Sequence, residues 1–84
     1  MSAGSINLRL FARYAELLGH RELALEVEAG ETVATLVARL RATLPGGGDL
    51  PSSLLVAVNH RQAPPGHPVV PGDEVALLPP LAGG

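Results

Sequence analysis

The sequence predicts a two-layer α+β domain, in which one main helix packs on one face of a mixed sheet. Two observations predict this class. Apolar and polar residues alternate over 6–10 and 22–28, as in strands, and one long apolar stripe at helical spacing follows them. A single stripe needs a single sheet face to cover it. With 84 residues and no internal repeat, the chain is expected to form one domain over 1–84, folded over 5–80.

The first part of the chain predicts two strands separated by a short helix. Apolar residues fall at every second position of both strands, which is typical of strands with one buried face. Glycine can end the short helix because it adopts the left-handed conformation without strain. The elements are a strand over 6–11 with Ile6, Leu8 and Leu10 on one face, a helix over 12–18 before Gly19, and a strand over 22–28.

The main helix is expected to begin after Thr32, whose hydroxyl can accept from a first-turn N–H group. Pro45 ends the helical pattern. Three glycines follow at 46–48, and without a Gly-Lys-Ser/Thr motif they predict a flexible connector rather than a phosphate loop. The apolar stripe of this helix consists of Val33, Leu36, Val37, Leu40 and Leu44.

The last part of the chain predicts a short apolar strand over 54–58, a turn at Asn59-His60, room for a minor strand, and a final strand over 74–78. Pro71-Gly72 suits a type II turn before that strand, since Gly supplies the positive φ. The helical crossover, and apolar residues on both faces of the first and last strands, predict that these two strands lie side by side and parallel at the sheet centre.

Composition excludes several classes of function. Absence of Cys removes disulfides and thiolate metal sites, and the three His stand at no ligand spacing, so no metal and no cofactor are expected. A net charge of −2, with no Lys and two aromatic residues, argues against nucleic-acid binding. No apolar run or leader suggests a membrane, which makes a cytoplasmic protein the default. Nothing in the chain suggests a stand-alone enzyme.

One feature of the sheet predicts a partner. The final strand places Val75 and Leu77 on one face and Ala76 and Leu78 on the other. If Leu77 meets the helix, then Leu78, Phe11 and Leu55 form an apolar patch on the outer face, and such patches often mark interaction sites. The alternative is that loop 45–53 or loop 59–70 folds over them.

The end of the sequence predicts a reactive tail. Pro79-Pro80 cannot continue a sheet interior, because neither residue has an N–H group to donate. Residues 81–84, Leu-Ala-Gly-Gly, offer little to bury and are expected to be flexible. Gly83 and Gly84 lack a Cβ atom, so a terminal carboxylate here can enter a narrow enzyme channel. We interpret Gly84 as the reacting residue.

These motifs together resemble the small β-grasp sulfur carriers, and most closely those that serve as the small subunit of molybdopterin synthase. The resemblance spans nearly the whole chain and implies a ubiquitin-like β-grasp fold. It is carried by Phe11-Ala12-x-x-x-Glu16-Leu17-x-Gly19, by Val58-Asn59, and by Gly72-Asp73-Glu74-Val75-Ala76 leading to Pro79-Pro80-x-Ala82-Gly83-Gly84.

The resemblance implies a chemistry for the tail. An E1-like adenylating enzyme would bind the outer sheet face and adenylate the Gly84 carboxylate, and a sulfur donor protein would convert the adenylate to a thiocarboxylate. The tail would then enter the large subunit of molybdopterin synthase, in a heterotetramer, and deliver sulfur to the pterin precursor of the molybdenum cofactor. The residues expected to meet these partners are Phe11, Leu78, Pro79, Pro80, Leu81 and Ala82, with Gly83 and Gly84 at the reaction.

Two alternatives stay open at this stage. The chain could carry sulfur for thiamine, cysteine or tRNA thiolation, or act as a ubiquitin-like modifier, which changes only the partner. It could also be a β-grasp interaction module whose Gly-Gly is incidental, and such a module should tolerate removal of the tail.

Overall fold

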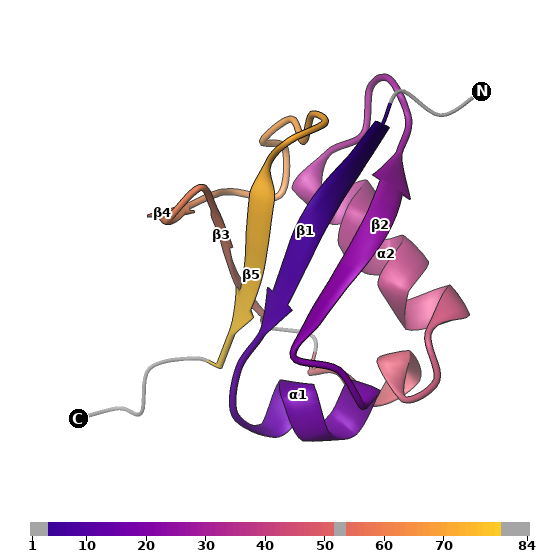
Figure 1. Ribbon diagram of the computed structural model, residues 1–84. Helices are drawn as coiled ribbons and strands as arrows, with labels where there is room; N and C mark the ends of the chain where they lie inside the picture. The colour runs from indigo at the N-terminus through magenta and orange to yellow at the C-terminus, as the bar shows by residue number, and fades with distance from the viewer. Residues whose placement is uncertain (1–3, 52–53, 80–84) are drawn as a thin grey trace.

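The computed structural model describes residues 4–51 and 54–79, which form five strands, two α-helices and one 3₁₀ turn (Figure 1). The partner-binding positions 80–82 and the reactive pair 83–84 of the sequence analysis lie outside these residues, so tail flexibility stays a prediction. In chain order the elements are β1 (Gly4–Leu10), α1 (Arg13–Leu18), β2 (Glu22–Val27), α2 (Val33–Thr43), η1 (Gly47–Asp49), β3 (Leu55–Val58), β4 (Arg61–Gln62) and β5 (Glu74–Leu78).

The strands form one mixed sheet in the order β2-β1-β5-β3-β4. β1 and β5 pair in parallel, with Leu8 opposite Val75 and Leu10 opposite Leu77. The other pairs are antiparallel. The prediction that the first and last strands are parallel neighbours inside the sheet is confirmed, and the order is that of a β-grasp fold. The minor strand suggested by the sequence is β4.

The core lies between the sheet and α2, which crosses one sheet face (Figure 1). Alternation along each strand selects the residues that meet the helix: Leu8, Val75 and Leu77 are fully buried. Leu36 and Leu40 cover them from α2, each 1% exposed. Fully burying one such side chain contributes about 1.5–3 kcal/mol. Because α2 covers only one face of the sheet, the opposite face does not contribute to this core.

The start of α2 is fixed as the sequence predicts. Thr32 Oγ1 accepts from the Thr35 N–H at 3.2 Å, and Thr35 Oγ1 accepts from the Thr32 N–H at 2.8 Å. This reciprocal arrangement satisfies two backbone donors that a helix start leaves unpaired, and such a cap stabilises a protein by about 1 kcal/mol. The chain before β5 also packs here, because the N–H groups of Val33 and Ala34 donate to the carbonyls of His67 and Pro65.

A hydrogen-bond network sets the start of β5. Asn59 and His60 form a two-residue hairpin turn between β3 and β4, with φ of 51° and 71°. The Asn59 amide donates to Asp73 Oδ1 and accepts from the Glu74 N–H, both at 2.9 Å. Asp73 Oδ2 accepts from the Val70 N–H, also at 2.9 Å. The Val58-Asn59 and Gly72-Asp73-Glu74 motifs are therefore joined by hydrogen bonds, which fix the start of β5 beside β3.

Several element boundaries differ from the sequence prediction by one or two residues, and two of them adjoin Ala12. β1 ends at Leu10 instead of residue 11, and α1 begins at Arg13. Ala12 between them has φ 52° and ψ −126°, and the Tyr14 N–H donates to the Phe11 carbonyl. This is a tight turn with Ala12 at a position usually held by glycine. Sequence reasoning placed an ordinary helical residue here, because alanine gives no signal of a positive φ.

The prediction of a flexible connector at 46–48 was wrong. Gly46 has φ 83°, and a Cβ atom on it would overlap the carbonyl of Leu17. Gly47 is buried, and a Cβ atom on it would overlap the carbonyl of Leu40. The segment is therefore packed: its backbone lies against the carbonyl of Leu17 in α1 and that of Leu40 in α2. Glycine is needed for close backbone approach, not for freedom of movement.

We expect Gly47→Ala to destabilise the protein by about 1–3 kcal/mol, because the clash is with backbone that cannot move aside. Gly48→Ala is the matched control, since nothing lies within 4 Å of its added Cβ. Urea unfolding of both variants gives the comparison. Equal stability of the two variants would show that the turn at 46–48 is not packed as described.

Candidate docking site at the end of the last strand

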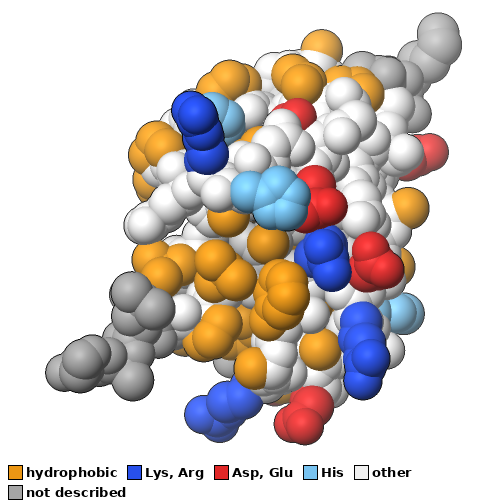
Figure 2. All heavy atoms as spheres, turned by 60° about the vertical axis from the view of Figure 1, so that its left-hand side comes forward, with side chains coloured by type: hydrophobic (Ala, Val, Ile, Leu, Met, Phe, Trp, Pro, Cys, Tyr) orange, Lys and Arg blue, Asp and Glu red, His pale blue; other side chains and the backbone are white. Residues whose placement is uncertain are grey.

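The outer face of the sheet carries an apolar cluster, here called the outer patch: Phe11, Leu55, Ala57, Ala76 and Leu78. Register places Leu55 opposite Leu78 and Ala57 opposite Ala76, so these four side chains share the face turned away from α2. Phe11 joins them across the end of β1, where it lines the same hollow as Ala76 and Leu78. Figure 2 shows apolar side chains gathered at the middle of this face.

Phe11 is presented to solvent by a strained turn. Phe11 is the only Phe in the chain, and it is 40% exposed. The positive φ of Ala12 turns the backbone into α1 directly after Phe11. Such a conformation costs a non-glycine residue about 1–3 kcal/mol and persists only where its surroundings enforce it. The turn therefore holds an aromatic side chain at the surface, where aromatic residues often anchor partner proteins.

A strip of charged and polar residues borders the outer patch on one side: Arg9, Glu22, His60 and Glu74 (Figure 2). Arg9 lies 3.9 Å from Glu22 and 3.7 Å from Glu74, and its guanidinium sits 5.6 Å from the centre of the Phe11 ring. Ion pairs this exposed contribute little to stability, about 0–1 kcal/mol. A charged rim beside an apolar centre instead favours specificity in docking.

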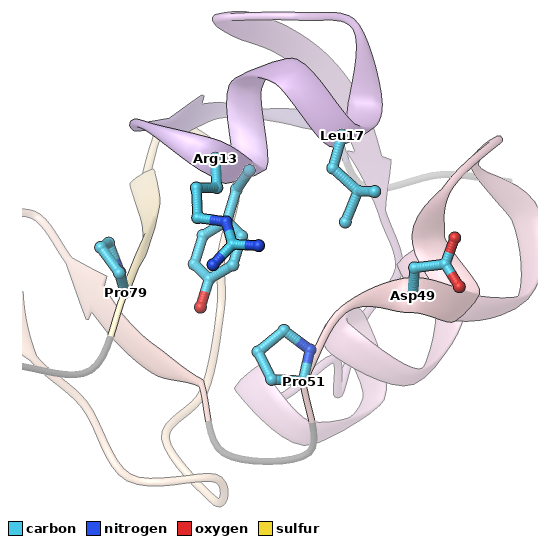
Figure 3. Close-up of a pocket in the computed structure, with 6 residues that line it drawn as sticks. Arg13, Leu17, Asp49, Pro51 and Pro79 are labelled. Carbon is cyan, nitrogen blue, oxygen red and sulfur yellow. The ribbon is translucent and has the colours of Figure 1, made fainter.

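A groove of about 700 Å³ lies where β5 ends, between α1 and the segment after η1. Arg13 and Leu17 reach into it from α1, Pro51 lies opposite, and Pro79 stands at one side (Figure 3). Pro79 is the last residue that the structure describes before the tail. The outer patch, through Leu78, and the groove, through Pro79, therefore adjoin each other at the end of β5.

The structure brings together three of the predicted site residues. Phe11, Leu78 and Pro79 all lie at the end of the sheet where β1 and β5 finish. Leu78 is half-buried and Pro79 is exposed. Of the two loops suggested as covers, the segment 65–69 bonds to the start of α2 and Gly46 and Gly47 pack on the helices, whereas His60 borders the outer patch.

Sequence reasoning missed the polar strip and the groove. Arg9, Glu22 and Glu74 are ordinary alternating residues of three separate strands, and only the register places them side by side. The groove lies between α1 and residues 49–51, which are more than 30 positions apart in the sequence. In the described part of the chain, no three acidic or His side chains gather in a way that could hold a metal ion. No helix among those residues is long and apolar enough to cross a membrane.

Two known proteins are similar to this chain over nearly its whole length. The molybdopterin synthase sulfur carrier subunit of Arabidopsis thaliana is 31% identical over 83 residues, which are 99% of this chain and 86% of that protein. SAMP1 of Haloferax volcanii, a small archaeal modifier protein, has a crystal structure with a TM-score of 0.78 and 32% identity, covering 96% of this chain and 100% of that one.

A third similarity concerns the fold alone. A chain in the complex of subunits 1 and 2 of the molybdopterin-converting factor from Helicobacter pylori matches with a TM-score of 0.66 and 22% identity, over 95% of this chain and 99% of that one. The model of the ThiS family matches residues 8–84, a range that includes the end of β1, all of β5 and the Gly-Gly tail. On this match the chain belongs to the ThiS family.

Proposed function

We propose that this chain is a sulfur carrier of molybdenum cofactor biosynthesis. An E1-like enzyme adenylates the Gly84 carboxylate, a sulfur donor protein replaces AMP to leave a thiocarboxylate, and the loaded tail gives its sulfur to the pterin precursor inside molybdopterin synthase. The observation that carries the proposal is that the outer patch contains Leu78, which lies six positions before the terminal Gly84 in the sequence. A partner that docks on this patch would receive the tail in its own active site.

The geometry supports docking by the sheet rather than catalysis by this chain. The outer patch offers a half-buried Leu78 and an exposed Phe11 side by side, while Arg9 and Glu74 supply charges at its border. Truncating central apolar or aromatic anchors of an interface typically costs 2 kcal/mol or more. The same surface can serve two partners in turn, first the adenylating enzyme and then the large synthase subunit.

The tail supports the chemistry. Five residues follow Pro79, and five extended residues span about 17 Å, enough to reach from a docked surface into an enclosed site. Pro80 restricts the backbone directly before the tail, and the two terminal glycines leave its end thin. The nucleotide site would belong to the adenylating enzyme. This chain would supply the reacting carboxylate and the docking surface.

The choice of the molybdenum pathway rests on the Pro79-Pro80 motif and on the 31% identical curated relative. It is tested with a carrier whose Gly84 thiocarboxylate is made chemically, from a C-terminal thioester and sulfide. Mixed with the large subunit of a molybdopterin synthase and pterin precursor, it should yield molybdopterin in proportion to carrier. Carrier bearing an ordinary carboxylate is the control. Binding to the large subunit without product would refute this pathway.

A second candidate function is covalent modification of proteins, which the 32% identity to a small archaeal modifier protein favours. The two functions share the activated Gly84 but differ in the nucleophile that attacks it. A modifier forms an amide with lysines of other proteins, so cells that express the tagged chain should contain tagged species of higher mass that survive denaturation and reduction. Loss of these species on deletion of Gly84 would support modification.

A further inference from the structure

The outer patch is hollowed at its middle, where two alanines meet. Ala57 of β3 lies opposite Ala76 of β5, and the side chains that flank Ala76 on the same face of β5 are the larger Glu74 and Leu78. The small pair leaves a hollow of about 360 Å³ in the outer face of the sheet. Its floor is apolar, since both alanines line it.

The two ends of this hollow differ in chemistry. Where β5 finishes, the hollow is lined by Phe11 and Leu78, which are apolar. Where β5 starts, it is lined by Glu74, whose side chain is 31% exposed. A side chain lying along the hollow would meet apolar atoms over most of its length and a carboxylate at one end. Lysine and arginine have this build, an apolar stem that ends in a charged group.

The Glu74 carboxylate keeps the capacity to accept a closer donor. Arg9 Nη1 lies 3.7 Å and His60 Nε2 3.4 Å from the same oxygen, Oε2. Charge-assisted hydrogen bonds are shorter, about 2.7–2.9 Å. Arg9 is also shared with Glu22, at 3.9 Å, so two carboxylates face one guanidinium and negative charge is in surplus. The nearby Arg61 lies opposite the core residue Val58 and therefore on the other face of the sheet.

Docking on the outer patch would cover this carboxylate. The His60 ring already stands beside it, on a residue with φ 71° in a two-residue turn, a position that favours glycine. A carboxylate that loses water without gaining a cation is costly, and attraction between opposite charges strengthens as water is excluded. A partner that fits the outer patch must therefore bring positive charge to Glu74.

We infer that the partner docking on the outer patch inserts one lysine or arginine side chain into this hollow, with its stem over Ala57 and Ala76 and its charged group on Glu74. The inference rests on the docking step of the proposed function and names the chemistry of the partner's surface. Glu74 is then a specificity-determining residue. A partner that offered a carboxylate here would meet two glutamates for one arginine and bind poorly.

The test measures association and dissociation rates of the full chain with its activating enzyme at pH 8, where histidine side chains carry little charge. Glu74→Gln keeps the shape of the side chain and removes its charge. It should speed dissociation by about 30-fold or more, because loss of one member of a close charge pair in an interface acts mainly on dissociation. The bond from the Glu74 N–H to Asn59 is made by the backbone, so urea unfolding should show a folded variant.

Glu26→Gln is the matched control. Glu26 is exposed on the same face of the sheet but lies on β2, opposite Ser5 and outside the hollow. It removes the same charge and should leave the dissociation rate unchanged. The partner's cation is found by changing each lysine and arginine on the docking surface of the enzyme to methionine. One of these changes should lose its effect on dissociation when it is combined with Glu74→Gln.

Two results would overturn the inference. Equal dissociation rates for Glu74→Gln and Glu26→Gln would mean that the face acts only through its general charge. Slower dissociation of Glu74→Gln would mean that the partner presents a carboxylate. Binding that depends on Glu74 but leads to no sulfur loading would instead refute the proposed function and leave the inference standing.

Discussion

Deletion of Gly84 should reduce sulfur loading by more than about 100-fold while leaving the fold intact. The variant still ends in glycine, at position 83, so its carboxylate is chemically equivalent. It is about 3.4 Å closer to the docking surface, however, and a misplacement of even 1 Å at a reacting centre can lower a rate about 100-fold. Adenylation by the cognate activating enzyme, followed as ATP–pyrophosphate exchange, gives the rate directly.

Deletion of Ser2 is the matched control, because it also shortens the chain by one residue but at the other terminus. It should leave exchange unchanged. Thermal melting should be the same for both deletions, since neither removes a residue of the core. Normal exchange by the Gly84 deletion would mean that the position of the carboxylate relative to the outer patch is unimportant, which contradicts docking with a threaded tail.

Leu78→Glu should weaken activation by about 30-fold or more without unfolding the protein. Leu78 points to the outer face and is only half-buried, so we expect its replacement to change stability by no more than about 1 kcal/mol. In a partner interface the new carboxylate would lose its water without gaining a counterion, and loss of a central anchor costs at least about 2 kcal/mol of binding. Adenylation kinetics and urea unfolding, measured together, separate the two effects.

Val70→Glu provides the control for surface charge in general. Val70 is 52% exposed and lies outside the outer patch, in the segment before β5, so the same substitution there should leave activation unchanged. An unfolded Leu78→Glu protein would place Leu78 in the core. Equal activation by the two folded variants would show that the outer patch is not the docking surface.

The sheet could be predicted because its signals are local and repeated. Alternation in β1 and β2 marks which of their residues face the core, and the apolar stripe of α2 shows that only one face of the sheet is covered. The cap at Thr32 is equally local, since donor and acceptor lie three residues apart. Parallel pairing of β1 with β5 followed from the helical crossover. The apolar residues expected on both faces of β1 are not there, because Phe11 lies beyond its end and Asn7 and Arg9 occupy its outer face.

What could not be predicted depends on contacts between distant parts of the chain. Gly46 is required because the Leu17 carbonyl comes against it, and nothing near either residue indicates that approach. The positive φ of Ala12 has no signal in an alanine. The polar strip needs the strand register before Arg9 and Glu74 become neighbours. The site was therefore predicted in its apolar residues and missed in its polar border and its groove.

The most direct test of the account is the intact mass of the chain after incubation with its activating enzyme, ATP and a sulfur donor. The account predicts a single species heavier by the mass difference between sulfur and oxygen, with the change located at Gly84 by fragmentation. Omission of ATP should abolish it. A chain that binds the activating enzyme yet keeps its original mass, or gains sulfur anywhere other than Gly84, would contradict the claim that this protein carries sulfur on its C-terminal glycine.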